Sequence, residues 1–143
     1  MKKSVTYREL QKFDNLATAY LRRNEYFDDK GWTKKEPTKL VTNIKNVVKQ
    51  CAKHFETYKE LVDEIHIDNC LVDEKTKAIL REENGTYKFS KEGLKEVSKK
   101  IKDLAGTSVD LHVRITEGNL DLSDEEKEAF NGIVIPAFEP NED

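Results

Sequence analysis

The chain has 143 residues, of which 37% are charged and 36% hydrophobic, and its formal net charge is −3. A chain of this length can bury a core without disulfides or a structural metal, and two cysteines are too few for a disulfide framework. No stretch approaches the roughly eighteen apolar residues of a membrane span, and the first residues lack the apolar run of a secretory signal. We therefore expect a cytoplasmic protein without a membrane partner.

The net charge conceals an opposition between the two parts of the sequence. Residues 1–60 carry a net charge of +6, and residues 61–143 carry −9, with most of the negative excess after Ile115. Two interpretations remain open: the oppositely charged parts attract each other in the fold, or an acidic C-terminal face meets a basic partner.

The first predicted element is a helix over residues 6–24. Thr6 and Glu9 have the spacing of a capping box, and an apolar face continues from Leu10 to Leu21. Residues 26–37 show no apolar period and contain a glycine and a proline, so we expect a long connection there.

A long amphipathic helix is expected over residues 38–66. Apolar residues recur at alternating spacings of three and four and form one stripe: Val41, Ile44, Val48, Cys51, Phe55, Tyr58, Val62 and Ile65. The first helix is too short to cover this stripe completely. Its distal end, around Tyr58, Val62 and Ile65, must be covered either by the chain's own sheet or by another molecule.

Shorter elements are expected after residue 66. Ile67, Asn69 and Leu71 suggest extended pieces, and Asn84-Gly85 predicts a two-residue type I′ hairpin that pairs Leu80 with Phe89. Residues 90–106 should form a helix, 109–115 a half-buried strand, 123–131 a short capped helix and 133–135 a last strand. The prediction is a single α+β domain over 1–143. It combines a helical hairpin over 6–66, a small antiparallel sheet with short helices over 67–138, and a frayed tail over 139–143.

Four potential zinc ligands, Cys51, His54, His66 and Cys70, have spacings that suggest a structural metal site. If residues 51–66 form one helix, however, Cys51 and His66 lie about 22 Å apart along its axis, too far for one tetrahedral ion. The sequence also contains no Gly-rich phosphate loop, nucleophile elbow or zinc-protease motif. We predict neither a metal, nor a cofactor, nor an enzymatic activity.

Binding of a partner is the remaining class of function. Basic and aromatic residues alternate in the connection, which would suit nucleic acid, but acidic residues in the same stretch and a pI of about 5.7 favour a protein partner or self-association. The candidate partner-binding residues are Tyr26, Phe27, Trp32, Lys34, Lys35, Tyr58, Val62, Ile65, Asp124, Glu125 and Glu126.

Residues 60–138 resemble small, Lys/Glu-rich accessory proteins of tailed bacteriophages and prophages. The resemblance lies in the type and order of four segments: Val72-Asp73-Glu74-Lys75-Thr76-Lys77, Asn84-Gly85-Thr86-Tyr87-Lys88-Phe89, Ser90-Lys91-Glu92-Gly93-Leu94-Lys95 and Phe130-Asn131-Gly132-Ile133-Val134-Ile135-Pro136. It implies a protein that acts through contacts. Two versions follow, an inhibitor of a host defence protein in the infected cytoplasm, or a self-assembling head or tail component of the virion.

Overall fold

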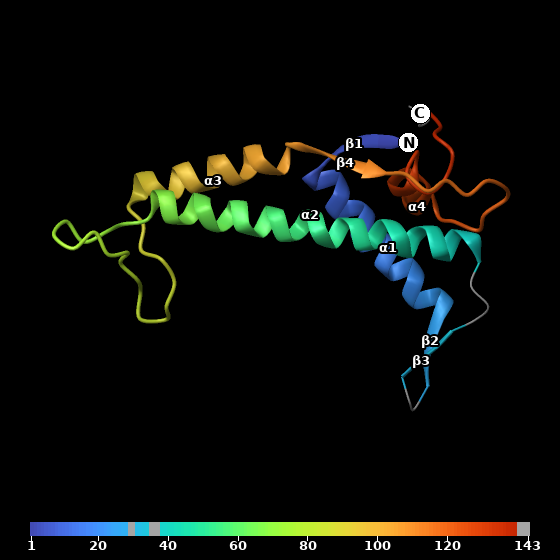
Figure 1. Ribbon diagram of the computed structural model, residues 1–143, viewed down its shortest axis with the longest axis horizontal. Helices are drawn as coiled ribbons and strands as arrows, with labels where there is room; N and C mark the ends of the chain where they lie inside the picture. Colours follow the sequence, from blue (N-terminus) through green and yellow to red (C-terminus); the bar gives the residue numbers. More distant parts are fainter. Residues whose placement is uncertain (29–30, 35–37, 140–143) are drawn as a thin grey trace. The chain divides into compact units, whose positions relative to one another are not determined.

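The computed structural model describes residues 1–28, 31–34 and 38–139, and within 25–34 it describes the backbone only. Its elements confirm the predicted α+β class and the long helix (Figure 1). In chain order they are β1 (Lys2–Thr6), α1 (Tyr7–Asn24), β2 (Glu25–Asp28), β3 (Gly31–Lys34), α2 (Lys39–Asn69), α3 (Lys91–Ala105), β4 (Ser108–His112) and α4 (Asp124–Phe130).

The chain divides into two compact units. The terminal unit comprises Met1–His54 and Ser108–Asp143, and the middle unit comprises Phe55–Thr107. This division cuts across the predicted one between 6–66 and 67–138, because helix α2 contributes its first part to one unit and its last part to the other.

The hydrophobic core lies in the terminal unit. Of the sixteen buried apolar side chains among the described residues, all except Val97 belong to this unit. Phe130 at the end of α4 packs edge-on against Phe13 of α1, with ring centroids 5.4 Å apart, and against Tyr20 at 6.2 Å. Ile44 and Cys51 bring the buried side of α2 into the same unit. Apolar burial is therefore concentrated in one part of the chain.

Two short antiparallel sheets are present. β1 pairs with β4 so that Val5 lies opposite Val109, and β2 pairs with β3 so that Phe27 lies opposite Trp32. The second pair corrects the prediction of an irregular connection over residues 26–37. Aromatic and β-branched residues favour extended backbone, and a hairpin this short has too few positions to show an alternating pattern.

Side chains cap the first turns of the helices, as the predicted helix starts require. The Thr6 amide donates to Glu9 Oε1 at 3.0 Å while the Glu9 amide donates to Thr6 Oγ1 at 3.1 Å, so α1 begins at Tyr7. The Val41 amide donates to Thr38 Oγ1, and the hydroxyl of Ser90 caps α3. Each cap satisfies amides that the first helical turn leaves without partners.

Helix α2 continues to Asn69, which makes the prediction of extended backbone at Ile67 and Asn69 wrong. The Asn69 side-chain amide donates to Ile65 O at 2.8 Å and closes the last turn. Ile67 is compatible with this helix because it lies off the apolar stripe and stays 43% exposed. An apolar residue outside the stripe was mistaken for the start of a strand.

Residues 70–90 form two bridged turns around a closed ring of backbone hydrogen bonds. The Leu71 amide donates to Lys88 O, the Lys88 amide to Leu80 O and the Leu80 amide to Leu71 O, at 2.8, 3.1 and 3.0 Å. The predicted type I′ hairpin is wrong: Arg81 pairs with Tyr87, the Gly85 amide donates to Glu82 O, and only Gly85 of the Asn84-Gly85 pair has a positive φ, +88°. A turn of type I followed by a left-handed glycine explains this one-residue shift of register.

The last apolar segment is a buried turn and not the predicted strand. The Ile133 and Val134 amides both donate to Phe130 O, and Gly132 has a φ of +72° that permits the reversal. Ile133, Val134 and Ile135 are nevertheless buried. Three consecutive buried residues have no period that separates a strand from a packed turn.

Candidate interaction surface

The distal stripe of α2 is only half-buried. Tyr58, Val62 and Ile65, three of the predicted partner-binding residues, all lie on α2 within the middle unit with intermediate exposure. Helix α3 lies beside this part of α2 (Figure 1). Both α3, through Gly93, and the 70–90 segment, through Tyr87 and Phe89, therefore lie against the distal part of α2.

Gly93 permits the close approach of α3 to the end of α2. A Cβ atom placed on Gly93 would lie 2.8 Å from the backbone oxygen of Asn69, a separation that real Cβ atoms essentially never show. Gly93 lies in the first turn of α3, and Asn69 is the last residue of α2. Glycine costs helix stability relative to alanine, so its presence here is explained by this contact.

Aromatic contacts attach the second turn of the 70–90 segment to α2. The His66 ring stacks on Tyr87 at a centroid distance of 6.4 Å and lies 5.9 Å from Phe89. The guanidinium of Arg81 lies 4.5 Å from the centroid of the Tyr87 ring. Aromatic packing and a cation–π interaction, and not buried aliphatic side chains, therefore stabilise this segment.

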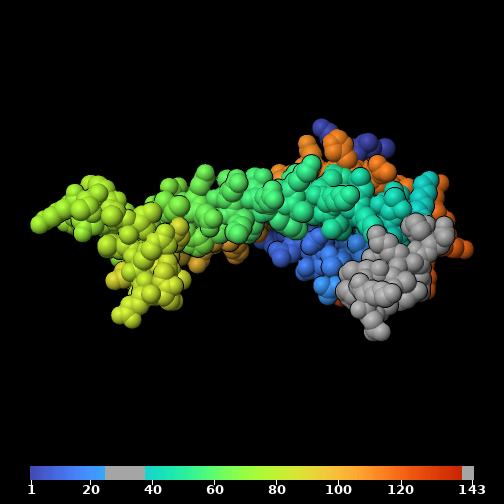
Figure 2. All heavy atoms as spheres, turned by 60° about the horizontal axis from the view of Figure 1, so that its bottom comes forward, coloured from blue at the N-terminus to red at the C-terminus, as the bar shows by residue number. Residues whose placement is uncertain are grey.

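The middle unit leaves apolar side chains in contact with water. Among the described residues, Val97 is its one buried apolar side chain. Five large apolar side chains, which we call the middle-unit apolar surface, are at least 36% exposed: Ile67, Leu71, Val72, Ile79 and Leu94. Figure 2 shows the segment that carries three of them, residues 70–90, as the yellow-green part of the molecule.

These five residues were not among the predicted binding residues. Val72 and Ile79 pair across an antiparallel bridge, so their side chains lie on one face of the first turn of the 70–90 segment. Ile67 could have been found from the sequence, because it is apolar and does not fit the spacing of the stripe. The exposure of the other four depends on packing, which the sequence pattern does not show.

The predicted basic and aromatic candidates lie on the β2–β3 hairpin. Tyr26 and Phe27 are in β2, and Trp32 and Lys34 are in β3. Only their backbone is described, and Lys35 lies outside the described residues. Their role in binding stays a prediction.

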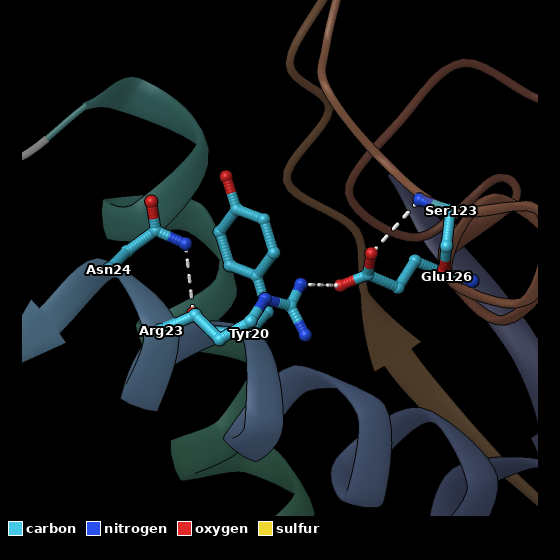
Figure 3. A network of polar contacts seen from close by, with 5 residues as sticks. All are labelled: Tyr20, Arg23, Asn24, Ser123 and Glu126. Carbon is cyan, nitrogen blue, oxygen red and sulfur yellow. Dashed lines mark hydrogen bonds and ion pairs between the residues drawn. The ribbon is translucent and has the colours of Figure 1, made fainter.

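The acidic candidates on α4 do not act as a group. Asp124 and Glu125 are exposed, but Glu126 is buried, with 5% of its surface exposed, and forms an ion pair with Arg23 of α1 (Figure 3). Its other carboxylate oxygen accepts from the Ser123 amide at 2.9 Å, which completes the predicted capping box. The carboxylate of Glu126 is therefore already paired within the fold, and the role of Asp124, Glu125 and Glu126 in binding stays a prediction.

The Arg23–Glu126 pair also supports the first interpretation of the charge opposition, in which the two parts of the chain attract each other. A second pair, between Lys12 Nζ and Glu128 Oε1 at 3.9 Å, again joins α1 to α4. Lys12 and Glu128 are both largely exposed, so this second pair contributes little to stability.

The pKa of Glu126 reflects these contacts. Burial by itself would raise it, but the hydrogen bond from the Ser123 amide and the contact with Arg23 outweigh burial and hold the pKa below the ordinary value of 4.5. Arg23 stacks over Tyr20 at 5.5 Å from the ring centroid, yet its side chain is 57% exposed, so solvent weakens the ion pair.

Because this pKa is lowered in the folded state, the ionised carboxylate stabilises the fold at pH values above 4.5, and the contribution disappears as the pH falls through the folded-state pKa. We expect Glu126→Gln to lower the free energy of unfolding by about 1 kcal/mol at neutral pH and by much less in acid. Urea titrations between neutral and acidic pH measure this difference. The exposed neighbour provides the control, Glu125→Gln, and equal pH profiles for the two variants would contradict the assignment.

The four potential zinc ligands have other roles in the structure. Cys51 is buried in the core, and burial followed by the charge of Asp14 raises the pKa of its thiol to about 12. His54 Nε2 lies 3.0 Å from Asp110 O and must donate its proton there, since a carbonyl oxygen only accepts. His66 belongs to the aromatic cluster, and the Cys70 thiol donates to Ile67 O. Across residues 1–28, 31–34 and 38–139, no three His, Cys, Asp or Glu residues are grouped to hold a metal.

No protein-family model, curated protein sequence or solved structure matches the chain. No helix in the described part of the chain is both long enough and apolar enough to cross a membrane.

Proposed function

We propose that this protein acts by binding another protein, without catalysis, through the middle-unit apolar surface. The observation that carries the proposal is the contrast between the units: among the described residues, fifteen of the sixteen buried apolar side chains lie in the terminal unit, and five of the seven exposed large apolar side chains lie in the middle unit. Exposed apolar side chains gain free energy when a partner removes them from water, and Val72 and Ile79 lie on one face.

The chemistry of this surface suits a protein partner. Leu71, Val72 and Ile79 are aliphatic, so they gain mainly from being removed from water and offer no side-chain hydrogen bonds to a nucleic acid base or a small polar ligand. Charged residues lie near them in the sequence: Lys75 and Lys77 fall between the paired residues Val72 and Ile79, and Glu82 and Glu83 fall in the next turn, and all four are exposed. An apolar centre with a polar rim is the usual composition of a protein–protein interface.

Two versions of this function follow from the resemblance to bacteriophage accessory proteins. In the preferred version, the protein inhibits a host defence protein in the bacterial cytoplasm and binds it as a separate small molecule. In the alternative, it is a component of the virion and assembles with copies of itself. Light scattering at micromolar concentration distinguishes them, since the first version expects a monomer and the second a closed ring or larger assembly.

The function is tested by charging the surface. The variant Leu71→Glu/Leu94→Glu should retain the circular dichroism spectrum and thermal midpoint of the natural protein, because both residues are at least 40% exposed. We expect it to capture at least tenfold less partner from extracts of infected bacteria, the effect of losing roughly 1.4 kcal/mol of binding free energy.

The matched control is Phe138→Glu, which charges an apolar residue of similar exposure, 42%, in the terminal unit. It should capture the partner as the natural protein does. Equal capture by all three proteins would exclude the middle-unit apolar surface as the binding site.

A further inference from the structure

The sheet formed by β1 and β4 has two edges, and α2 covers only the edge of β4. The side-chain amide of Gln50 pairs with the backbone of His112 in both directions: Nε2 donates to His112 O at 2.9 Å, and the His112 amide donates to Oε1 at 2.9 Å. His54 donates to Asp110 O, the next outward-facing carbonyl of β4. These side chains occupy the hydrogen-bonding positions that a third strand would take beside β4.

In the described part of the chain, no strand pairs with the other edge of β1. The Val113 amide donates to Met1 O at 3.0 Å, and in an antiparallel pair the backbone groups of alternate residues face the partner strand. With the observed register, Lys3 and Val5 therefore face β4, and Lys2 and Ser4 direct their N–H and C=O groups away from it. Both are exposed, and apart from β4 no described residue forms a hydrogen bond with either of them.

The positive charge of β1 favours an acidic segment as the added strand. Lys2 is exposed and lies on the opposite face from Lys3, whose Nζ donates to Asn131 O at 2.9 Å, and no acidic residue occurs in the strand. A second copy of β1 added antiparallel would bring lysines of the two copies close together, which is unfavourable for cross-strand neighbours. An acidic segment would instead place its carboxylates beside the exposed Lys2.

A pocket lies on the core-facing side of the same strand. Its volume is about 300 Å³ and its lining is mixed: Val5, Ala129 and Ile133 are apolar, and Lys3, Glu9, Lys12, Glu128 and Asn131 are charged or polar. Residues of an added strand that face the same side as Val5 would lie next to this pocket, and alternate residues would lie next to Lys2. The charge of Lys2 therefore favours acidic residues at alternate positions of the added strand, and the positions between them lie next to this mixed pocket.

We propose that the exposed edge of β1 binds an extended acidic segment of a partner protein, with a carboxylate at alternate positions, as a third strand of the sheet. The backbone groups of Lys2 and Ser4 would form the new hydrogen bonds, and Lys2 would meet the acidic residues. This site rests on observations in the terminal unit alone, so it stands or fails independently of the middle-unit apolar surface.

The test uses a labelled peptide of alternating glutamate and valine and a matched peptide with lysine in place of glutamate. Fluorescence anisotropy with the full chain, tagged only at its C-terminus, should show binding of the glutamate peptide at least tenfold tighter than of the lysine peptide. Absence of binding, or equal binding of both peptides, would overturn the proposal.

Two variants locate the binding on β1. Ser4→Pro removes an outward N–H without touching the ladder to β4, and should weaken binding about tenfold, whereas Ser4→Ala keeps the N–H and should bind normally. Lys2→Glu should shift the preference toward the lysine peptide by about tenfold. If Ser4→Pro does not fold, this shift in peptide preference is the test of whether the peptide binds at β1. An unchanged preference in Lys2→Glu would exclude this edge as the site.

Discussion

Replacing Phe130 with alanine is expected to lower the free energy of unfolding by about 3–5 kcal/mol. The Phe130 side chain is fully buried and packs against Phe13 and Tyr20, so its removal leaves a cavity between α1 and α4. Since domains are stable by only about 5–15 kcal/mol, this single change should remove a large part of the total. Chemical denaturation followed by circular dichroism measures it.

Phe138→Ala is the control for this prediction. Phe138 is 42% exposed, and the Asn131 side chain holds it through its backbone, accepting from the Phe138 amide and donating to Phe138 O. Alanine keeps both hydrogen bonds, so the change should cost no more than about 0.5 kcal/mol. If the two alanine variants were equally stable, the core would not lie where the structure places it.

Thr116→Val is expected to destabilise the protein by about 1–3 kcal/mol, although valine and threonine have nearly the same shape. Asn43 Nδ2 donates to Thr116 Oγ1 at 2.8 Å, and both residues are buried, with exposures of 5% and 6%. Valine removes the acceptor and leaves the amide of Asn43 buried without it. The cost comes from this unsatisfied donor and not from lost volume.

The double variant Asn43→Leu/Thr116→Val distinguishes the two explanations. It replaces the whole polar pair by apolar groups of similar size, so we expect it to be more stable than Thr116→Val alone. Denaturant midpoints of the natural protein, both single variants and the double variant provide the measurement. Additive losses in the double variant would show that the hydrogen bond has no special role.

The two proposed binding surfaces should differ in the salt dependence of binding, because they depend on different interactions. The middle-unit apolar surface gains free energy from removing Leu71 and Leu94 from water, so its binding should depend only weakly on salt. The edge of β1 combines backbone hydrogen bonds with the charge of Lys2, so its preference for acidic peptides should weaken as salt is added.

Local signals predicted the helices well. The capping pairs at Thr6 and Ser123, the stripe from Val41 to Ile65 and the apolar face of residues 94–104 all appear as helices, because each depends on residues within one or two turns of each other. Strand β1 was missed, because it is defined by its pairing with Ser108–His112, more than a hundred residues away.

The sequence by itself determined the α+β class, the long helix and the placement of Cys51 in an apolar stripe, since helical periodicity and caps are local properties. Only the tertiary structure decided that Glu126 is paired within the fold, that α3 lies beside the distal part of α2, and that Leu71 and Ser4 are exposed. The physical reason is that burial and the pairing of backbone groups depend on contacts between distant segments, and the same residue pattern is compatible with either outcome.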